Sequence, residues 1–121
     1  MTDAPQQTLG LTEFRRLAHK LGTERGEARR DMERYAQQEA DAERDYRREL
    51  ATAYAKARSA GETGNGAEIA ARAEAADAKH KRDLAAAMYH STKERIASIE
   101  ATRAMLRAEA EWSQRIDGTV A

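Results

Sequence analysis

Gly61-Glu62-Thr63-Gly64-Asn65-Gly66 is the stretch of sequence that decides the fold. Its three glycines and one asparagine are typical of a turn, because these residues tolerate backbone conformations that others avoid. Both flanking stretches lack proline and are rich in Ala, Glu, Arg and Lys, a composition typical of long helices and coiled coils. The sequence therefore predicts an all-α protein built as a long antiparallel helical hairpin that resembles a coiled coil.

We expect one domain over residues 1–121, because the chain is short enough for a single core. Its predicted elements are a flexible lead-in (1–10), a short N-terminal helix (11–22), a long helix (24–60), the glycine-rich turn (61–66) and a second long helix (67–117). Gly22 is expected to end the short helix and Thr23 to cap the long helix that follows. The short helix is then expected to fold back over the open end of the hairpin, or alternatively to dock into a partner groove.

The first long helix carries an apolar row at alternating spacings of three and four residues, as in a heptad repeat. The row consists of Ala28, Met32, Tyr35, Ala42, Tyr46, Leu50, Ala53 and Ala57. Glu39 falls on this row, where a polar residue can fix the register of two helices. The alternative is a local rotation of the helix that turns Ala40 inward instead.

The second long helix carries a comparable row. Its expected inward residues are Ile69, Ala73, Ala76, His80, Leu84, Met88, Thr92, Ile96, Ile99, Leu106, Ala110 and Ser113. Close packing is expected near the turn, where small alanines permit a short distance between helix axes. In this register we expect Tyr54 to lie opposite Leu84 or slightly earlier.

The apolar fraction is 40%, but 27 of the 121 residues are alanine. Each buried alanine removes little area from water, so an isolated hairpin would have a weak core. We therefore expect the chain to associate with itself, as a homodimer or a higher helical-bundle oligomer. The bulkiest apolar residues gather at the open end, so the expected partner-binding residues are Phe14, Leu17, Met105, Leu106 and Trp112.

The charge of the chain is balanced, with 21 Lys and Arg against 21 Asp and Glu. No basic arm marks a nucleic-acid-binding protein, so a nucleic-acid partner is the less favoured expectation. The chain has no cysteine, which excludes disulfides and thiolate metal sites. No apolar run approaches the length of a membrane span, and no signal peptide is recognisable. We expect a cytoplasmic protein without a membrane partner.

Catalytic and metal-binding patterns are weak. Asp77 and His80 form one Asp-x-x-His pair, whereas a carboxylate di-metal centre in a helical bundle needs two such units and further carboxylates. The serines lack the strained turn or adjacent base of a nucleophile, and the glycine cluster lacks the Lys-Ser/Thr of a phosphate loop. We therefore expect a non-enzymatic protein with no catalytic residues, no metal and no cofactor.

Residues 46–57, the glycine-bearing turn, residues 67–78 and Lys93-Glu94-Arg95-Ile96 resemble a group of small helical phage and prophage proteins. The resemblance covers about residues 40–115 and implies a phage or prophage accessory protein with no established activity. We accordingly expect a structural protein that binds itself and a host or phage protein. The alternative is an accessory factor in phage DNA recombination or replication that contacts DNA through an Arg-rich helix face.

Overall fold

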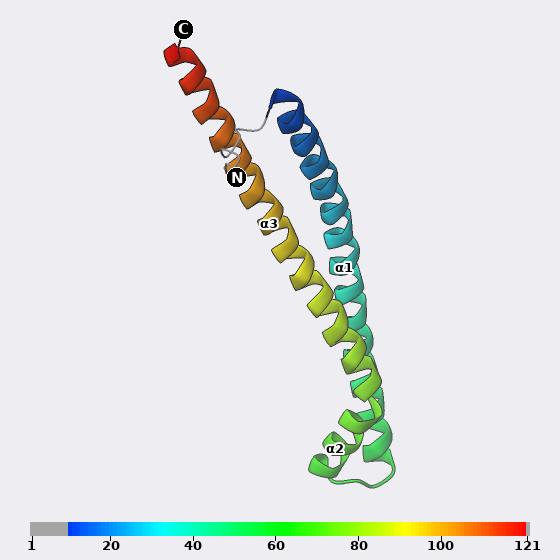
Figure 1. Ribbon diagram of the computed structural model, residues 1–121. Helices are drawn as coiled ribbons and strands as arrows, with labels where there is room; N and C mark the ends of the chain where they lie inside the picture. Colours follow the sequence, from blue (N-terminus) through cyan, green and yellow to red (C-terminus); the bar gives the residue numbers. More distant parts are fainter. Residues whose placement is uncertain (1–9, 121) are drawn as a thin grey trace, which may run out of the picture. The chain divides into compact units, whose positions relative to one another are not determined.

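The computed structural model describes residues 10–120, with side chains described as far as Ile116, and within this range it contains three helices and no strand. They are α1 (Leu11–Ser59), α2 (Gly64–Glu74) and α3 (Ala76–Val120) (Figure 1). Long α1 and long α3 pack against each other, which confirms the predicted all-α helical hairpin. Of the predicted lead-in (1–10), residues 1–9 lie outside the described residues, and Gly10 directly precedes α1.

The chain divides into two compact units. Unit 1 combines the start of α1, up to Arg29, with the part of α3 from Glu94 onward. Unit 2 contains Arg30–Lys93, and therefore the rest of both long helices, the turn and α2. Each unit has its own helix-to-helix contacts and is described separately below.

The predicted break after Gly22 does not occur, because α1 continues through this position without interruption. Thr23 does not cap a new helix: its hydroxyl donates a hydrogen bond to the carbonyl of His19, 3.1 Å away and one turn earlier. Gly22 in a helix costs about 1 kcal/mol relative to alanine. A cost of this size does not break a helix that packs through apolar residues on both sides of the glycine. The predicted separate helix at 11–22 is wrong, because it is the first part of α1.

The turn is tighter than the predicted 61–66 segment. Gly61 has φ +95°, the left-handed conformation that follows the end of many helices. Its N–H donates to the carbonyl of Arg58 at 3.0 Å, and the N–H of Glu62 donates to the carbonyl of Ala57 at 3.1 Å. These two bonds form a Schellman motif, which satisfies the carbonyls at the end of α1.

Thr63 then caps α2. Its hydroxyl accepts a hydrogen bond from the N–H of Gly66 at 3.0 Å, and its carbonyl accepts one from Ala67 at 2.8 Å. Gly64 and Gly66 therefore belong to the first turn of a helix rather than to the turn between helices. The predicted helix at 67–117 begins three residues early and divides at Ala75, whose backbone leaves the helical conformation at φ −90° and ψ 9°.

The buried core of the described residues consists almost entirely of small side chains, and no large side chain is fully buried among them. In unit 2 the buried residues are Ala42, Ala53, Ala67, Ala71, Ala75, Ala85 and Thr92, and in unit 1 they are Ala28 and Ile99. Three of the unit 2 alanines, at positions 67, 71 and 75, are at most 1% exposed. The prediction of close, alanine-mediated packing near the turn is confirmed.

The predicted inward row of the second helix is correct from Thr92 onward and wrong before it. Ile69, Leu84 and Met88 are 62%, 55% and 40% exposed, and Ala73, Ala76 and His80 are exposed as well. The inward positions of this stretch are Ala71, Ala75, Ala78, Arg82, Ala85 and Tyr89. The buried members of this row are the small Ala71, Ala75 and Ala85, which allow close approach of the helices. Arg82 has a place in the row because Tyr46 and Glu43 of α1 contact its guanidinium.

The register also differs from the prediction. Tyr54 lies beside α2, because its hydroxyl is 3.8 Å from the place of a Cβ on Gly64, and Leu84 lies beside residues 38–45 instead. On α1, Glu39 is half-buried and Ala40 is exposed, so the heptad row passes through the glutamate.

Candidate functional site

The five residues predicted to bind a partner all belong to unit 1, but they do not form one surface. Phe14, Leu17 and Leu106 are half-buried, and of these Phe14 and Leu106 line a cavity between α1 and α3. Met105 and Trp112 are 73% and 59% exposed on α3. The predicted cluster is therefore divided between an interhelical cavity and an outward face.

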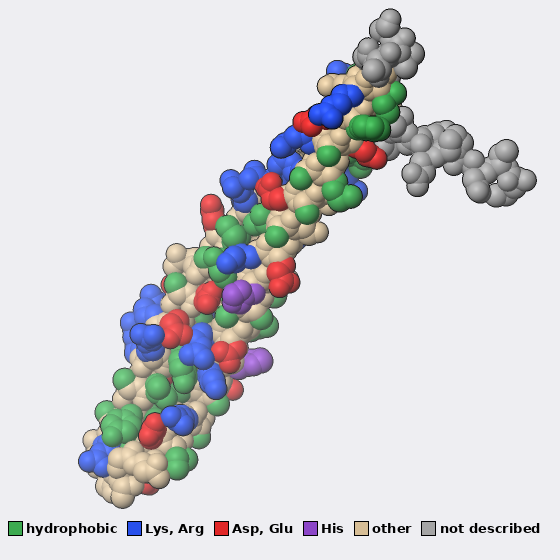
Figure 2. Space-filling model, turned by 90° about the vertical axis from the view of Figure 1, so that its left-hand side faces the viewer, with side chains coloured by type: hydrophobic (Ala, Val, Ile, Leu, Met, Phe, Trp, Pro, Cys, Tyr) green, Lys and Arg blue, Asp and Glu red, His purple; other side chains and the backbone are tan. Residues whose placement is uncertain are grey.

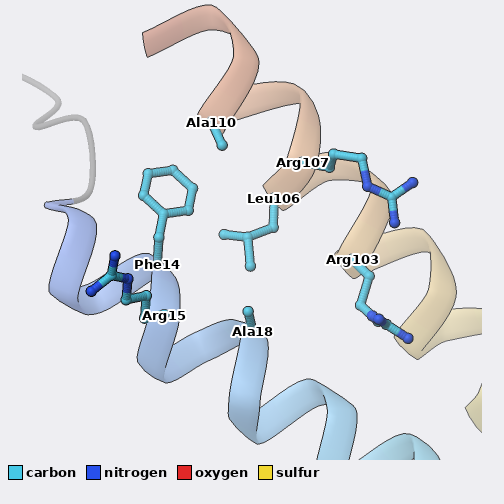
Figure 3. Close-up of a pocket in the computed structure, with 7 residues that line it drawn as sticks. All are labelled: Phe14, Arg15, Ala18, Arg103, Leu106, Arg107 and Ala110. Atoms are coloured by element: carbon cyan, nitrogen blue, oxygen red, sulfur yellow. The ribbon is translucent and has the colours of Figure 1, made fainter. Parts of the chain in front are cut away.

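The cavity has a volume of about 260 Å³ and opens between the first turns of α1 and the later turns of α3. Phe14 and Leu106 extend toward one another from the two helices and form its apolar floor (Figure 3). The complete lining is Phe14, Arg15, Ala18, Arg103, Leu106, Arg107 and Ala110. We call this the Phe14–Leu106 cavity.

Arginine is the only charged residue type in that lining. The side chains of Arg15, Arg103 and Arg107 extend outward from the apolar floor (Figure 3). Among the described residues, Arg15 and Arg107 have neither an ion-pair partner nor a side-chain hydrogen bond. Arg15 and Arg107 therefore bring positive charge to the mouth of the cavity with which no carboxylate of the described residues pairs.

Arg103 connects the cavity to a second group of charges. Arg25 of α1 donates a hydrogen bond to the carboxylate of Glu100 on α3, and both side chains are partly buried. This hydrogen bond, with the positive charges of Arg25, Arg103 and Arg29, lowers the pKa of Glu100 below its ordinary value of 4.5. A single carboxylate, that of Glu100, thus interacts with three arginines, so this group of four side chains keeps a net positive charge.

The outward face of unit 1 contains Met105 and Trp112 on α3. The two residues are seven apart, so they lie on the same side of the helix. Leu106 and Ala110, which line the cavity, point to a different side. Ile116 lies one turn beyond Trp112 and is 41% exposed. We call Met105, Trp112 and Ile116 the outer face of α3.

Sequence reasoning missed the arginines of the cavity, although the heptad row contained a signal for one of them. The inward row of α3 in unit 1 runs through Ile96, Ile99, Arg103, Leu106 and Ala110 at spacings of three and four. Extending the apolar row through every heptad position would have included Arg103. Arg107 follows Leu106 of this row and Arg15 follows Phe14 on α1, and nothing in the sequence distinguishes these two from other exposed arginines.

Unit 2 contains a charged contact between its helices. The guanidinium of Arg82 on α3 lies over the ring of Tyr46 on α1 and pairs with Glu43 at 3.3 Å. Glu43 also accepts a hydrogen bond from Arg47 at 2.8 Å. That bond and the charge of Arg82 lower the pKa of Glu43 below 4.5. This contact joins two helices at a position where an apolar pair would be expected.

Asp77 and His80 are both exposed, and the described part of the chain has no group of three His, Asp or Glu side chains that would hold a metal ion. None of its helices is long and apolar enough to cross a membrane. On the face drawn in Figure 2, apolar side chains are interspersed with acidic and basic ones. Unit 1 combines an apolar cavity that has a basic mouth with a separate apolar face.

Comparison with known proteins gives no match, whether to protein-family models, to curated proteins or to solved structures.

Proposed function

We propose that this chain is a non-enzymatic, protein-binding structural accessory protein of phage or prophage origin that works as a helical-bundle oligomer in the host cytoplasm. The observation that carries the proposal is the outer face of α3, where Met105 and Trp112 are 73% and 59% exposed. The absence of cysteine suits a reducing compartment. The phage origin rests on the resemblance of residues 40–115 described above.

A second copy of the chain is the occupant that the outer face of α3 fits. The described helices bury no large side chain completely, so a helix pair alone gains little from the hydrophobic effect. A two-fold dimer brings the same face from both copies together, which places two Met105 and two Trp112 side chains in one interface. Full burial of such a side chain contributes roughly 1.5–3 kcal/mol.

The same magnitudes predict a modest affinity. Association costs about 4–15 kcal/mol in lost translational and rotational freedom, which offsets much of the gain from four apolar side chains. We expect a dissociation constant on the order of 10–100 µM. Sedimentation velocity over a concentration series across this range tests the expectation.

Variants of the outer face sharpen the test. Trp112→Glu and Met105→Glu place a charge in the proposed interface and should shift the protein to monomer. Ala104→Glu is the matched control, because Ala104 is exposed on another side of the same helix. A wild-type chain that remains monomeric at several hundred micromolar would refute the proposal.

Trp112 also gives a direct readout, since it is the only tryptophan in the chain. Burial of its ring in a dimer should shift the fluorescence emission to shorter wavelength as concentration rises. The shift should follow the sedimentation data in wild type and in Ala104→Glu.

Contact with DNA is the second candidate function, and one observation supports it. Arg25, Arg29 and Arg103 surround a single carboxylate in unit 1, and such a positive group can neutralise phosphates. A gel-shift titration at two salt concentrations tests this role. Tight binding that weakens steeply with salt would support it over the protein-only proposal.

A further inference from the structure

We infer that the Phe14–Leu106 cavity is a docking site for an acidic peptide segment that carries a large apolar anchor residue. This inference rests on the proposed protein-binding function and names the chemistry of the partner. It concerns a different surface from the outer face of α3, so the two are testable separately.

The size and lining of the cavity determine which side chain of the peptide can act as its anchor. A volume of about 260 Å³ lies below the range of roughly 300–1,000 Å³ that is usual for small-molecule pockets. It accommodates one large side chain, such as leucine, phenylalanine or tryptophan. Phe14, Leu106 and the two alanines present only carbon to that side chain. An apolar side chain therefore gains hydrophobic contact there without losing hydrogen bonds.

The charge at the mouth of the cavity determines which residues of the peptide should flank its anchor. Arg15, Arg103 and Arg107 line it without any acidic neighbour in the lining. A guanidinium binds a carboxylate through two parallel hydrogen bonds, and such charge-assisted pairs are stronger than neutral ones. Glu or Asp residues on either side of the anchor would match these arginines. Charge complementarity thus selects an acidic partner.

Nucleic acid fits the same surface less well. A phosphate backbone would pair with the arginines but would leave the apolar cavity empty. Single strands gain affinity when successive bases stack on exposed aromatic rings. Phe14 is the one aromatic residue in the cavity lining, and it is half-buried. The combination of apolar floor and basic mouth favours a peptide.

Fluorescence anisotropy of labelled probes tests the inference at about 0.1 M salt. The main probe is fluorescein-labelled Glu-Asp-Glu-Leu-Trp-Glu-Asp-Glu. Two comparison peptides lack either the anchor (Glu-Asp-Glu-Ala-Ala-Glu-Asp-Glu) or the acids (Gln-Asn-Gln-Leu-Trp-Gln-Asn-Gln). A twelve-nucleotide oligothymidylate represents single-stranded DNA. We expect the main probe to bind at least about tenfold more tightly than the other three, because each lacks one of the two contacts.

Protein variants locate the binding. Ala110→Leu fills the cavity and should abolish binding of the main probe, whereas Ala108→Leu adds the same side chain at an exposed position outside the lining. Arg15→Gln combined with Arg107→Gln should weaken binding by about tenfold or more. Arg16→Gln is its control, because Arg16 is exposed and pairs with Glu13. Circular dichroism confirms that each variant is helical.

Several outcomes would overturn the inference. These are equal binding of the peptide without the anchor, tighter binding of oligothymidylate, unchanged binding to Ala110→Leu, or no binding of the main probe at 1 mM protein. Trp112→Glu separates this inference from the proposed function, since that variant should lose self-association and keep peptide binding. Loss of both in Trp112→Glu would place the peptide at the dimer interface and contradict a docking site within one copy.

Discussion

The guanidinium of Arg82 lies 4.5 Å from the centre of the Tyr46 ring, and this contact joins α3 to α1 within unit 2. Arg82 occupies an inward heptad position, four residues after Ala78 and three before Ala85. Its side chain replaces an apolar contact by three others: the ring, Glu43 at 3.3 Å and Asp83 at 3.0 Å. A planar cation can satisfy all three at once because its faces stack while its edges donate.

We therefore predict that Arg82→Lys destabilises the protein although it conserves the charge. A lysine ammonium lacks the planar face and the fork of donors that the site uses. The midpoint of thermal unfolding, followed by circular dichroism, should fall by a few degrees. Arg72→Lys is the matched control, because Arg72 is exposed and pairs with Glu68 on its own helix. Equal midpoints for the two variants would contradict a structural role for the Arg82 contact.

Gly61 and Gly22 should respond to alanine in opposite directions. At Gly61 the φ of +95° is strained for any residue with a Cβ, so Gly61→Ala should cost about 1–2 kcal/mol of unfolding free energy. Gly22 lies within α1 with nothing near its Cβ position, so Gly22→Ala should stabilise by about 0.5–1 kcal/mol. Urea titrations of both variants measure the difference. A destabilising Gly22→Ala would argue against a continuous α1.

Ala67 should not tolerate a larger residue. It is 0% exposed in the contact between α2 and α1, so Ala67→Leu overpacks the contact and should cost about 1–3 kcal/mol. Ala70→Leu makes the same change at an exposed position of the same helix and should be nearly neutral. Chemical unfolding compares them, and similar values for the two positions would show that the helices near the turn can separate without cost.

Stability should decrease in acid through Glu43 and Glu100. The pKa of each is lowered in the folded protein, chiefly by the hydrogen bond from Arg47 and from Arg25 respectively. A lowered folded-state pKa contributes stability that is fully present above the ordinary carboxyl pKa of 4.5 and is lost as the pH falls through the folded-state values.

Thermal unfolding at a series of pH values between 7 and 3 measures this loss. The double variant Glu43→Gln, Glu100→Gln should be less stable than wild type at neutral pH and should lose less stability on acidification. Glu33→Gln serves as control, because Glu33 is exposed. If the double variant loses as much stability on acidification as wild type, the loss of stability is due to other carboxylates.

The fold was predictable because one glycine cluster between two long Ala, Glu and Arg-rich stretches leaves few alternatives. The inward row from Thr92 to Ser113 was also predictable, since bulky apolar residues recur there at heptad spacing. Before Thr92 the same spacing continues through Tyr89, Ala85 and Arg82, but the aliphatic Met88, Leu84 and Ile69 lie outside this row and are exposed. The prediction started its row at Ile69 and followed the aliphatic side chains, whereas close packing turns Ala71, Ala75 and Ala85 inward.

The candidate site was predictable only in part. Phe14 and Leu106 do meet, but through a continuous α1 rather than a separate short helix that folds back. Met105 and Leu106 are neighbours in sequence, and a helix turns by about 100° between neighbours, so they belong to different surfaces. Among the described residues no carboxylate pairs with Arg15 or Arg107. Which carboxylates come near in space is not revealed by spacing along one helix.

The Schellman turn at Gly61 has a consequence for the order of folding. Lys56 and Glu74, which pair at 3.7 Å, are 18 residues apart across the turn and α2, whereas Arg25 and Glu100 are 75 residues apart. Closing a longer loop costs more chain entropy, so native pairing should begin beside the turn and advance along both helices. The Phe14–Leu106 cavity is then assembled last and is the first part to open. Amide hydrogen exchange should be fastest around it, and a bound segment should slow exchange there most.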